Sequence, residues 1–176
     1  MKKSTWICLY FVVTSISCLL SLVLFSPRTK QETKTTTNTE NEKGISPNTG
    51  AKPYASIYGK DKTGKNTISF KTSKGTDYIV IIKTNSLEKV IGHIYIRGGD
   101  STSLHIPNGK YNVFFYTGLD WNPDKQKDVV FGGFMKMEHL QKDGPINIYN
   151  QNIQYTLYPV QNGNLVLQEA DETETF

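Results

Sequence analysis

The chain contains little cysteine, and none of it lies in the part that we expect to fold. Of its 176 residues, only Cys8 and Cys18 are cysteines. Downstream of residue 18 the sequence therefore excludes disulfide bonds, a thiol nucleophile and cysteine-ligated zinc. This absence is compatible with an oxidising compartment, although it does not demonstrate one. The length allows one ordinary domain with accessory segments and excludes a TIM barrel.

Most of the chain also lacks excess charge of either sign. The formal net charge of +4 arises in residues 1–52, which hold seven basic and three acidic residues. Residues 53–176 hold 13 basic and 13 acidic residues. A neutral domain lacks the basic footprint that binds a polyanion, so we expect no nucleic-acid partner.

Both cysteines lie in one long apolar segment, residues 5–26, which has no charge, proline or glycine. A helix of this length spans the hydrocarbon core of a bilayer. We interpret residues 1–26 as an uncleaved signal anchor, the single N-terminal transmembrane helix of a membrane protein. Two alternatives remain open: a signal peptide cleaved near Ser15-Ile16-Ser17, and a lipoprotein modified at Cys18.

The charges beside this segment leave its orientation open. Lys2 and Lys3 precede it, whereas Arg28, Lys30 and Lys34 follow it closely, and this count favours a cytoplasmic domain. Large domains, however, are translocated largely regardless of flanking charge. The MKK start is also typical of a bacterial export signal. We therefore expect the domain outside the cytoplasm, either in the periplasm or on the cell surface.

Residues 27–53 contain one large apolar side chain, Ile45, among Thr, Asn, Glu, Lys and Gln. Such a composition buries too little apolar surface to offset the entropy of ordering. We expect a flexible polar stalk.

Residues 54–168 are expected to form the domain. Helical periodicity is scarce, and short β-branched and aromatic runs alternate with turn signals such as Asn108-Gly109. This spacing predicts an all-β fold, a small antiparallel β-sandwich or barrel-like domain. Residues 169–176 are acidic and are expected to fray. The candidate strands are Ala55–Tyr58, Thr67–Lys71, Tyr78–Thr84, Val90–Arg97, Ser103–Ile106, Tyr111–Tyr116, Val129–Met137, Ile153–Pro159 and Leu165–Leu167.

Part of this domain resembles known modules. Residues 96–113, with Arg97-Gly98-Gly99 and then Pro107-Asn108-Gly109-Lys110-Tyr111, are similar to carboxypeptidase-regulatory-like and transthyretin-like β-sandwich modules. With Trp121, Gly132-Gly133-Phe134 and Asn162-Gly163-Asn164, the outline also resembles uncharacterised membrane-anchored envelope proteins of Bacteroides-type bacteria. The resemblance implies a fold and an envelope location, and it transfers no catalytic residue.

The segment Asp120–Asp128 carries the most suggestive chemistry. Asp120, Asn122 and Asp124 have the alternate spacing of a calcium loop, although an EF-hand would need Gly at 125 and Glu at 131, where Lys and Phe stand. Trp121 and Tyr116 are candidates for stacking on a sugar ring. The competing interpretations are a polar hairpin loop closed by local hydrogen bonds, and a Trp121 that folds back onto the domain.

The histidines suggest little. His93 and His105 fall on neighbouring expected strands and would bind a metal only with a further carboxylate, and His139 is distant in sequence. We expect no cofactor and no catalytic residue. The sequence thus favours a non-enzymatic binding or structural module of the bacterial envelope, with an envelope protein or a glycan as partner. The alternative is a carbohydrate-binding or glycan-processing domain that uses the Asp120–Asp128 loop and Trp121.

Overall fold

The computed structural model describes residues 45–158 and 165–176. The expected anchor at residues 1–26 and residues 27–44 of the expected stalk lie outside these ranges. No helix within them is long and apolar enough to cross a membrane.

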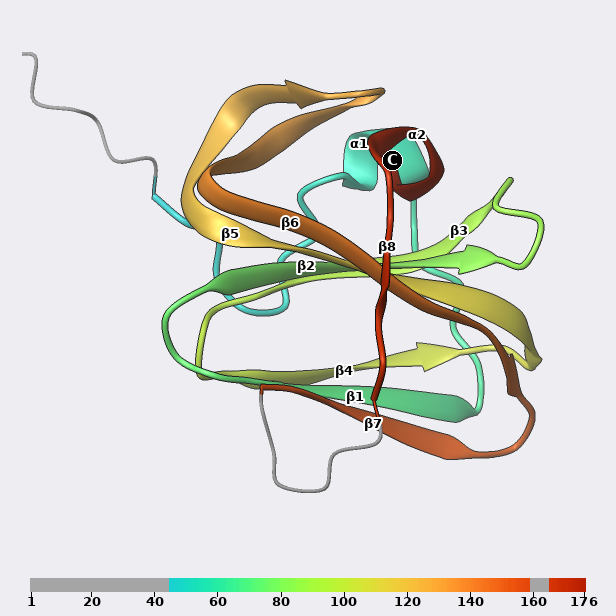
Figure 1. Cartoon of the computed structure of the whole chain (residues 1–176). Coiled ribbons are helices and arrows are strands. Elements are labelled where there is room, and N and C mark those ends of the chain that lie inside the picture. Colours follow the sequence, from blue (N-terminus) through green and yellow to red (C-terminus); the bar gives the residue numbers. More distant parts are fainter. Residues whose placement is uncertain (1–44, 159–164) are drawn as a thin grey trace, which may run out of the picture. The chain divides into compact units, whose positions relative to one another are not determined.

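The described chain forms two β-sheets, which confirms the all-β prediction (Figure 1). One sheet has the order β4-β1-β7 and the other the order β3-β2-β5-β6-β8. All neighbouring strands are antiparallel except β1 and β7. The elements are α1 (Ala55–Tyr58), β1 (Asn66–Thr72), β2 (Asp77–Thr84), β3 (Val90–Ile96), β4 (Ser101–Ile106), β5 (Gly109–Lys127), β6 (Val130–Ile148), β7 (Asn152–Leu157), β8 (Gln168–Glu169) and α2 (Glu172–Thr175).

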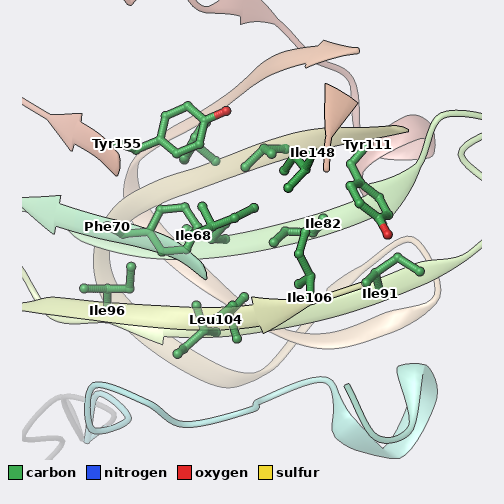
Figure 2. Close-up of a cluster of buried hydrophobic side chains, with 14 of the residues drawn as sticks. Ile68, Phe70, Ile82, Ile91, Ile96, Leu104, Ile106, Tyr111, Ile148 and Tyr155 are labelled. Carbon is green, nitrogen blue, oxygen red and sulfur yellow. The ribbon is translucent and has the colours of Figure 1, made fainter. Parts of the chain in front are cut away.

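The two sheets share one apolar core, which fits the expected sandwich. Strand β2 shows how the sequence builds it, because Val80 and Ile82 point toward the three-stranded sheet with no exposed surface. Successive side chains of a strand point to opposite faces, so every second residue reaches the same core. Figure 2 shows ten labelled members of this core: Ile68, Phe70, Ile82, Ile91, Ile96, Leu104, Ile106, Tyr111, Ile148 and Tyr155.

The other face of the five-stranded sheet is buried as well. From β2, Ile79 and Ile81 point away from the first core and have no exposed surface. This explains why β2 is apolar at consecutive positions instead of alternating. The cluster on this face is rich in aromatic rings: Tyr54, Ile79, Ile81, Tyr95, Phe114, Tyr116, Trp121, Val130, Phe134 and Phe176.

Strands β5 and β6 form a hairpin that is longer than predicted. Each has 19 residues, and the expected polar loop Asp120–Asp128 lies mostly within β5. The pairing register shifts between Thr117 and Leu119 and again between Asn122 and Gln126. Such bulges absorb extra residues and increase the local twist, so a polar, irregular sequence still pairs as a strand.

The segment Ala55–Tyr58, predicted as a strand, is instead the short helix α1. Its helical spacing brings the Tyr54 and Tyr58 rings together, with centroids 5.7 Å apart, over the sheet. In a strand, residues 54 and 58 would lie much farther apart than they do in a helix. Packing of the two rings therefore overrides the strand preference that the β-branched and aromatic composition implies. The predicted strand Leu165–Leu167 is also absent, since the nearby strand β8 begins at Gln168.

The described fold extends beyond the expected domain at both ends. Residues 46–53, expected as the end of the stalk, and residues 169–176, expected to fray, both contact the sheets. At the C-terminal end, Asp171 caps α2 through a reciprocal capping box, and the ring of Phe176 is only 6% exposed. The acidic side chains are held by cations, because Lys127 pairs with Glu172 and Lys142 pairs with Glu174.

Candidate functional site

Strand β3 lies at the edge of the five-stranded sheet, and residues 46–62 cover that edge. Gly50 N donates to Tyr95 O and Tyr95 N donates to Ala51 O, both at 2.9 Å, and Lys62 N donates to Ile91 O at 2.7 Å. Unpaired edge groups would otherwise remain open to strand addition. The segment that leads into the domain therefore closes this edge.

Arg97, which follows β3, fixes the start of the covering segment. Its Nε donates to Pro47 O at 2.9 Å and its Nη2 donates to Ser46 O at 2.7 Å. A guanidinium is a planar fork with donors in fixed directions, so it can hold two successive carbonyl groups. This contact explains why the ordered domain begins before residue 54.

His93 lies under the same segment with no exposed surface. Tyr54 N donates to its Nε2 at 3.2 Å, so Nε2 is an acceptor and the proton belongs on Nδ1, which lies 3.6 Å from Asp61 Oδ1. Burial would raise the pKa of Asp61, but hydrogen bonds from His93 and Lys52 outweigh it and lower that pKa. The histidine thus joins β3 to the covering segment, and its Nε2 is not free to bind a metal.

The structure also contains a cleft of about 600 Å³, which we call the lysine cleft. Its walls come from α1 and the residues after it, the end of β2, the β2–β3 turn, the β5–β6 turn and α2, so distant parts of the sequence meet there. Figure 1 shows α1 and α2 side by side on one face of the five-stranded sheet. The lining residues are Ile57, Tyr58, Gly59, Lys60, Lys62, Lys83, Leu87, Glu88, Lys89, Val90, Asp128, Val129, Thr173 and Phe176.

Lys83 is the most deeply placed charge of the cleft, with 5% of the residue exposed. Its Nζ donates to the main-chain oxygen of Glu174 at 2.8 Å and lies 5.8 Å from the centroid of the Phe114 ring. Burial lowers the pKa of Lys83, an effect only partly offset by the charges of Asp128 and Glu174. The cleft therefore has a partly desolvated ammonium group in its wall.

The rest of the lining combines charge with apolar surface. The lining also holds three further lysines, Lys60, Lys62 and Lys89, and two carboxylates, Glu88 and Asp128. Among the apolar residues, Ile57 and Val129 remain about half exposed, at 52% and 53%. On one wall, the hydroxyl of Tyr58 donates to Phe176 O at 3.1 Å, and burial raises the pKa of this tyrosine.

The predicted calcium ligands do not converge. Asp120 Oδ2 forms an ion pair with Lys136 Nζ at 2.6 Å, and Asn122 Oδ1 accepts a hydrogen bond from Asp124 N at 2.9 Å. The second contact is an Asx turn, the local bonding expected of a polar turn. Within residues 45–158 and 165–176, no group of three or more His, Cys, Asp or Glu side chains could hold a metal ion.

The predicted sugar platform is buried. Trp121 is 4% exposed and Tyr116 has no exposed surface. The Trp121 ring packs against Tyr95 and Phe134, with centroids 5.4 and 5.5 Å away. Both side chains belong to the core of the aromatic face, so neither offers a ring face to a ligand. This corrects the expectation that they form a binding site.

The other two histidines do not form a common site with His93. His105 is on β4, in the other sheet, and its Nδ1 lies 3.2 Å from Thr67 Oγ1. His139 Nε2 lies 3.4 Å from Glu169 Oε1 at an exposed position. The structure therefore does not bring the predicted His93 and His105 pair together.

The chain was compared with protein-family models, with curated proteins and with solved structures. None of them matches it. The resemblance to envelope proteins and to transthyretin-like modules stays a prediction.

The lysine cleft was missed at the level of sequence because its residues come from four separated segments. One signal was present nevertheless. Ile79, Ile81 and Lys83 share one face of a strand, where the lysine follows two buried isoleucines. A lysine at an inward position of a central strand indicates a buried cation with a specific partner.

Proposed function

We propose that this chain is a single-pass membrane protein of the bacterial envelope, which displays its all-β domain outside the cytoplasm as a non-enzymatic binding module. The apolar segment at residues 5–26 supports the membrane attachment. The polar composition of residues 27–44 supports a spacer between the membrane and the domain.

One structural observation carries the binding role. Residues 46–62 cover the edge of β3 and also supply α1, Lys60 and Lys62 to the lysine cleft. The segment that arrives from the membrane side of the chain is thus part of the cleft wall. The candidate ligand site is thus joined to the attachment through the covering segment of the sequence.

Fractionation and protease accessibility test the proposal. The full chain, expressed in a bacterium, should sediment with membranes, and a variant without residues 5–26 should remain soluble. Protease added to intact spheroplasts should degrade the domain. Full protection of the domain, with degradation after lysis, would refute the orientation.

A matched pair of variants separates the modes of attachment. Under a transmembrane anchor, Cys18→Ser and Cys8→Ser both leave the chain in the membrane. Loss of the membrane fraction in Cys18→Ser alone identifies a lipoprotein. A shorter mature chain that begins after Ser17, carries no lipid and leaves the membrane fraction identifies a cleaved signal peptide.

A further inference from the structure

We infer that the lysine cleft binds an amphiphilic anion, namely a phosphate or carboxylate head carrying a short apolar group. This inference names the ligand class of the binding role proposed above and rests on that role. Lys83 and the lysines of the cleft bind the head, and the exposed apolar side chains cover the tail.

The first step of the argument is the unused hydrogen-bonding capacity of Lys83. An ammonium group has three N–H donors. The carbonyl of Glu174 takes one of them, and the face of the Phe114 ring provides a second, weaker partner. The residue as a whole is 5% exposed and lines the cleft. An anion bound there can accept a further hydrogen bond from the ammonium group and add to the counter-charge of Asp128 and Glu174.

The second step concerns the other lysines of the cleft. Lys60, Lys62 and Lys89 form no ion pair with any described residue. By contrast, Lys127 and Lys142, on the nearby strands β5 and β6, are each paired with an acidic side chain of α2. A concave surface with walls of low dielectric concentrates the field of such unpaired charges.

The two carboxylates of the cleft limit the charge of the ligand. Counted by side chains alone, four lysines against Glu88 and Asp128 leave a net charge of about +2 in the lining. This balance suits one anionic head and disfavours a long polyanion. It also agrees with the neutral charge of residues 53–176 as a whole.

The apolar rim completes the site. Ile57 and Val129 are 52% and 53% exposed beside the lysines, and Leu87 and Phe176 also line the cleft. A volume of about 600 Å³ falls in the range of small-molecule sites. Burying the rim residues under an alkyl group removes apolar surface from water, which favours binding. A free inorganic anion would leave this surface exposed.

Calorimetric titration of the full chain in phosphatidylcholine nanodiscs tests the inference, with hexyl phosphate as the probe. Hexyl phosphate should bind about ten-fold or more tightly than inorganic phosphate, which lacks the tail, and than hexanol, which lacks the charge. Equal binding of hexanol and hexyl phosphate, or no binding of hexyl phosphate, would overturn the inference. Empty nanodiscs correct for partition into the lipid.

Variants localise the binding. Lys83→Met should weaken hexyl phosphate binding about ten-fold or more, whereas Lys71→Gln, on β1 outside the cleft, should leave it unchanged. Unchanged binding in a folded Lys83→Met would contradict the inference. If Lys83→Met does not fold, the double variant Lys62→Gln with Lys89→Gln provides the same test at exposed positions.

Nanodiscs that contain phosphatidic acid distinguish the source of the anion. If the anionic head belongs to a membrane lipid, the phosphatidic acid of these nanodiscs should compete with hexyl phosphate and weaken its apparent binding. If the head belongs to a free molecule, the affinity for hexyl phosphate should be the same as in phosphatidylcholine nanodiscs. Either result is compatible with the ligand class. Failure of hexyl phosphate to bind a chain that still sediments with membranes refutes the ligand class alone. A soluble chain that binds hexyl phosphate in the cleft refutes the membrane attachment alone.

Discussion

The ring of Phe176 packs edge-on against the ring of Tyr116, with the two centroids 5.3 Å apart and their planes at 89°. Phe176 also meets Tyr54 edge-on at 5.9 Å. An aromatic residue next to an acidic run thus joins rings from the covering segment and from β5. The acidic end of the chain folds because its last aromatic side chain has a place in the core.

Phe176→Ala should lower the free energy of unfolding by about 3 kcal/mol, because a buried phenyl ring is lost and a cavity remains. Urea denaturation of the full chain, followed by circular dichroism, measures the change. Val166→Ala is the control, since Val166 is 83% exposed and its truncation should change stability little. Equal stabilities of wild type and Phe176→Ala would mean that the end of the chain does not pack.

Gly132→Ala should destabilise the domain by about 2 kcal/mol or more, because a non-glycine residue is disfavoured there and clashes with Trp121. Gly132 has φ +109°, and a Cβ atom would lie 2.4 Å from Cζ2 of Trp121. Thermal melting with tryptophan fluorescence measures the change. Gly75→Ala is the matched control, with a similar φ of +114° and open space around its Cβ, so it isolates the clash from the backbone strain.

A chain that begins at residue 54 should be less stable and more prone to self-association than one that begins at residue 45. The shorter chain loses the carbonyl groups held by Arg97 and the pairing of Gly50 and Ala51 with Tyr95. The edge of β3 would then be open to another strand. Urea denaturation and size-exclusion chromatography compare the two. Identical behaviour would show that residues 45–53 are dispensable.

The stability of the domain should depend on acid through Glu138. Burial would raise its pKa, but hydrogen bonds from Lys125, Tyr116 and Lys127 outweigh it and hold the pKa below its ordinary value of 4.5. A depressed folded pKa gives stability that is present above the unfolded pKa and is lost as the pH falls through the folded value. Glu138→Gln should therefore lower the free energy of unfolding by about 1–3 kcal/mol at pH 7 and by less at pH 3.

Urea titrations at both pH values measure this difference. Asp124→Asn is the control, because Asp124 is exposed and its main-chain N, not its carboxylate, donates to Asn122 Oδ1. Its effect should be small at either pH. A cost of Glu138→Gln that is the same at pH 7 and pH 3 would contradict the role of the ionised carboxylate.

Local pattern was enough to predict most strands but not their arrangement. The apolar run of β2 and the turn signal at Asn108-Gly109 mark their elements correctly, because strand propensity and turn chemistry act within a few residues. The parallel pairing of β1 with β7 joins Thr67 to Asn152. Nothing in the sequence near either residue encodes that partnership, since it depends on how the two sheets pack.

The errors have a common physical cause. Asp120, Asn122 and Asp124 have a composition typical of a loop, yet the long β5–β6 hairpin carries them as a bulged strand. Tyr54 and Tyr58 have the composition of a strand, yet their rings pack at helical spacing. In both places tertiary contacts override local propensity. The lysine cleft lay beyond sequence reasoning because segments distant in the chain build its walls.

The covering segment also gives the domain a mechanical character. A pull on the chain upstream of residue 45 reaches β3 first through the Arg97 fork and the bonds of Gly50 and Ala51 with Tyr95. These contacts therefore bear the force before the hydrogen bonds between strands of the five-stranded sheet do. If residues 46–62 peel away, Lys60 and Lys62 leave the cleft with them. Tension on the chain upstream of residue 45 would thus reach these two lysines of the cleft through the covering segment.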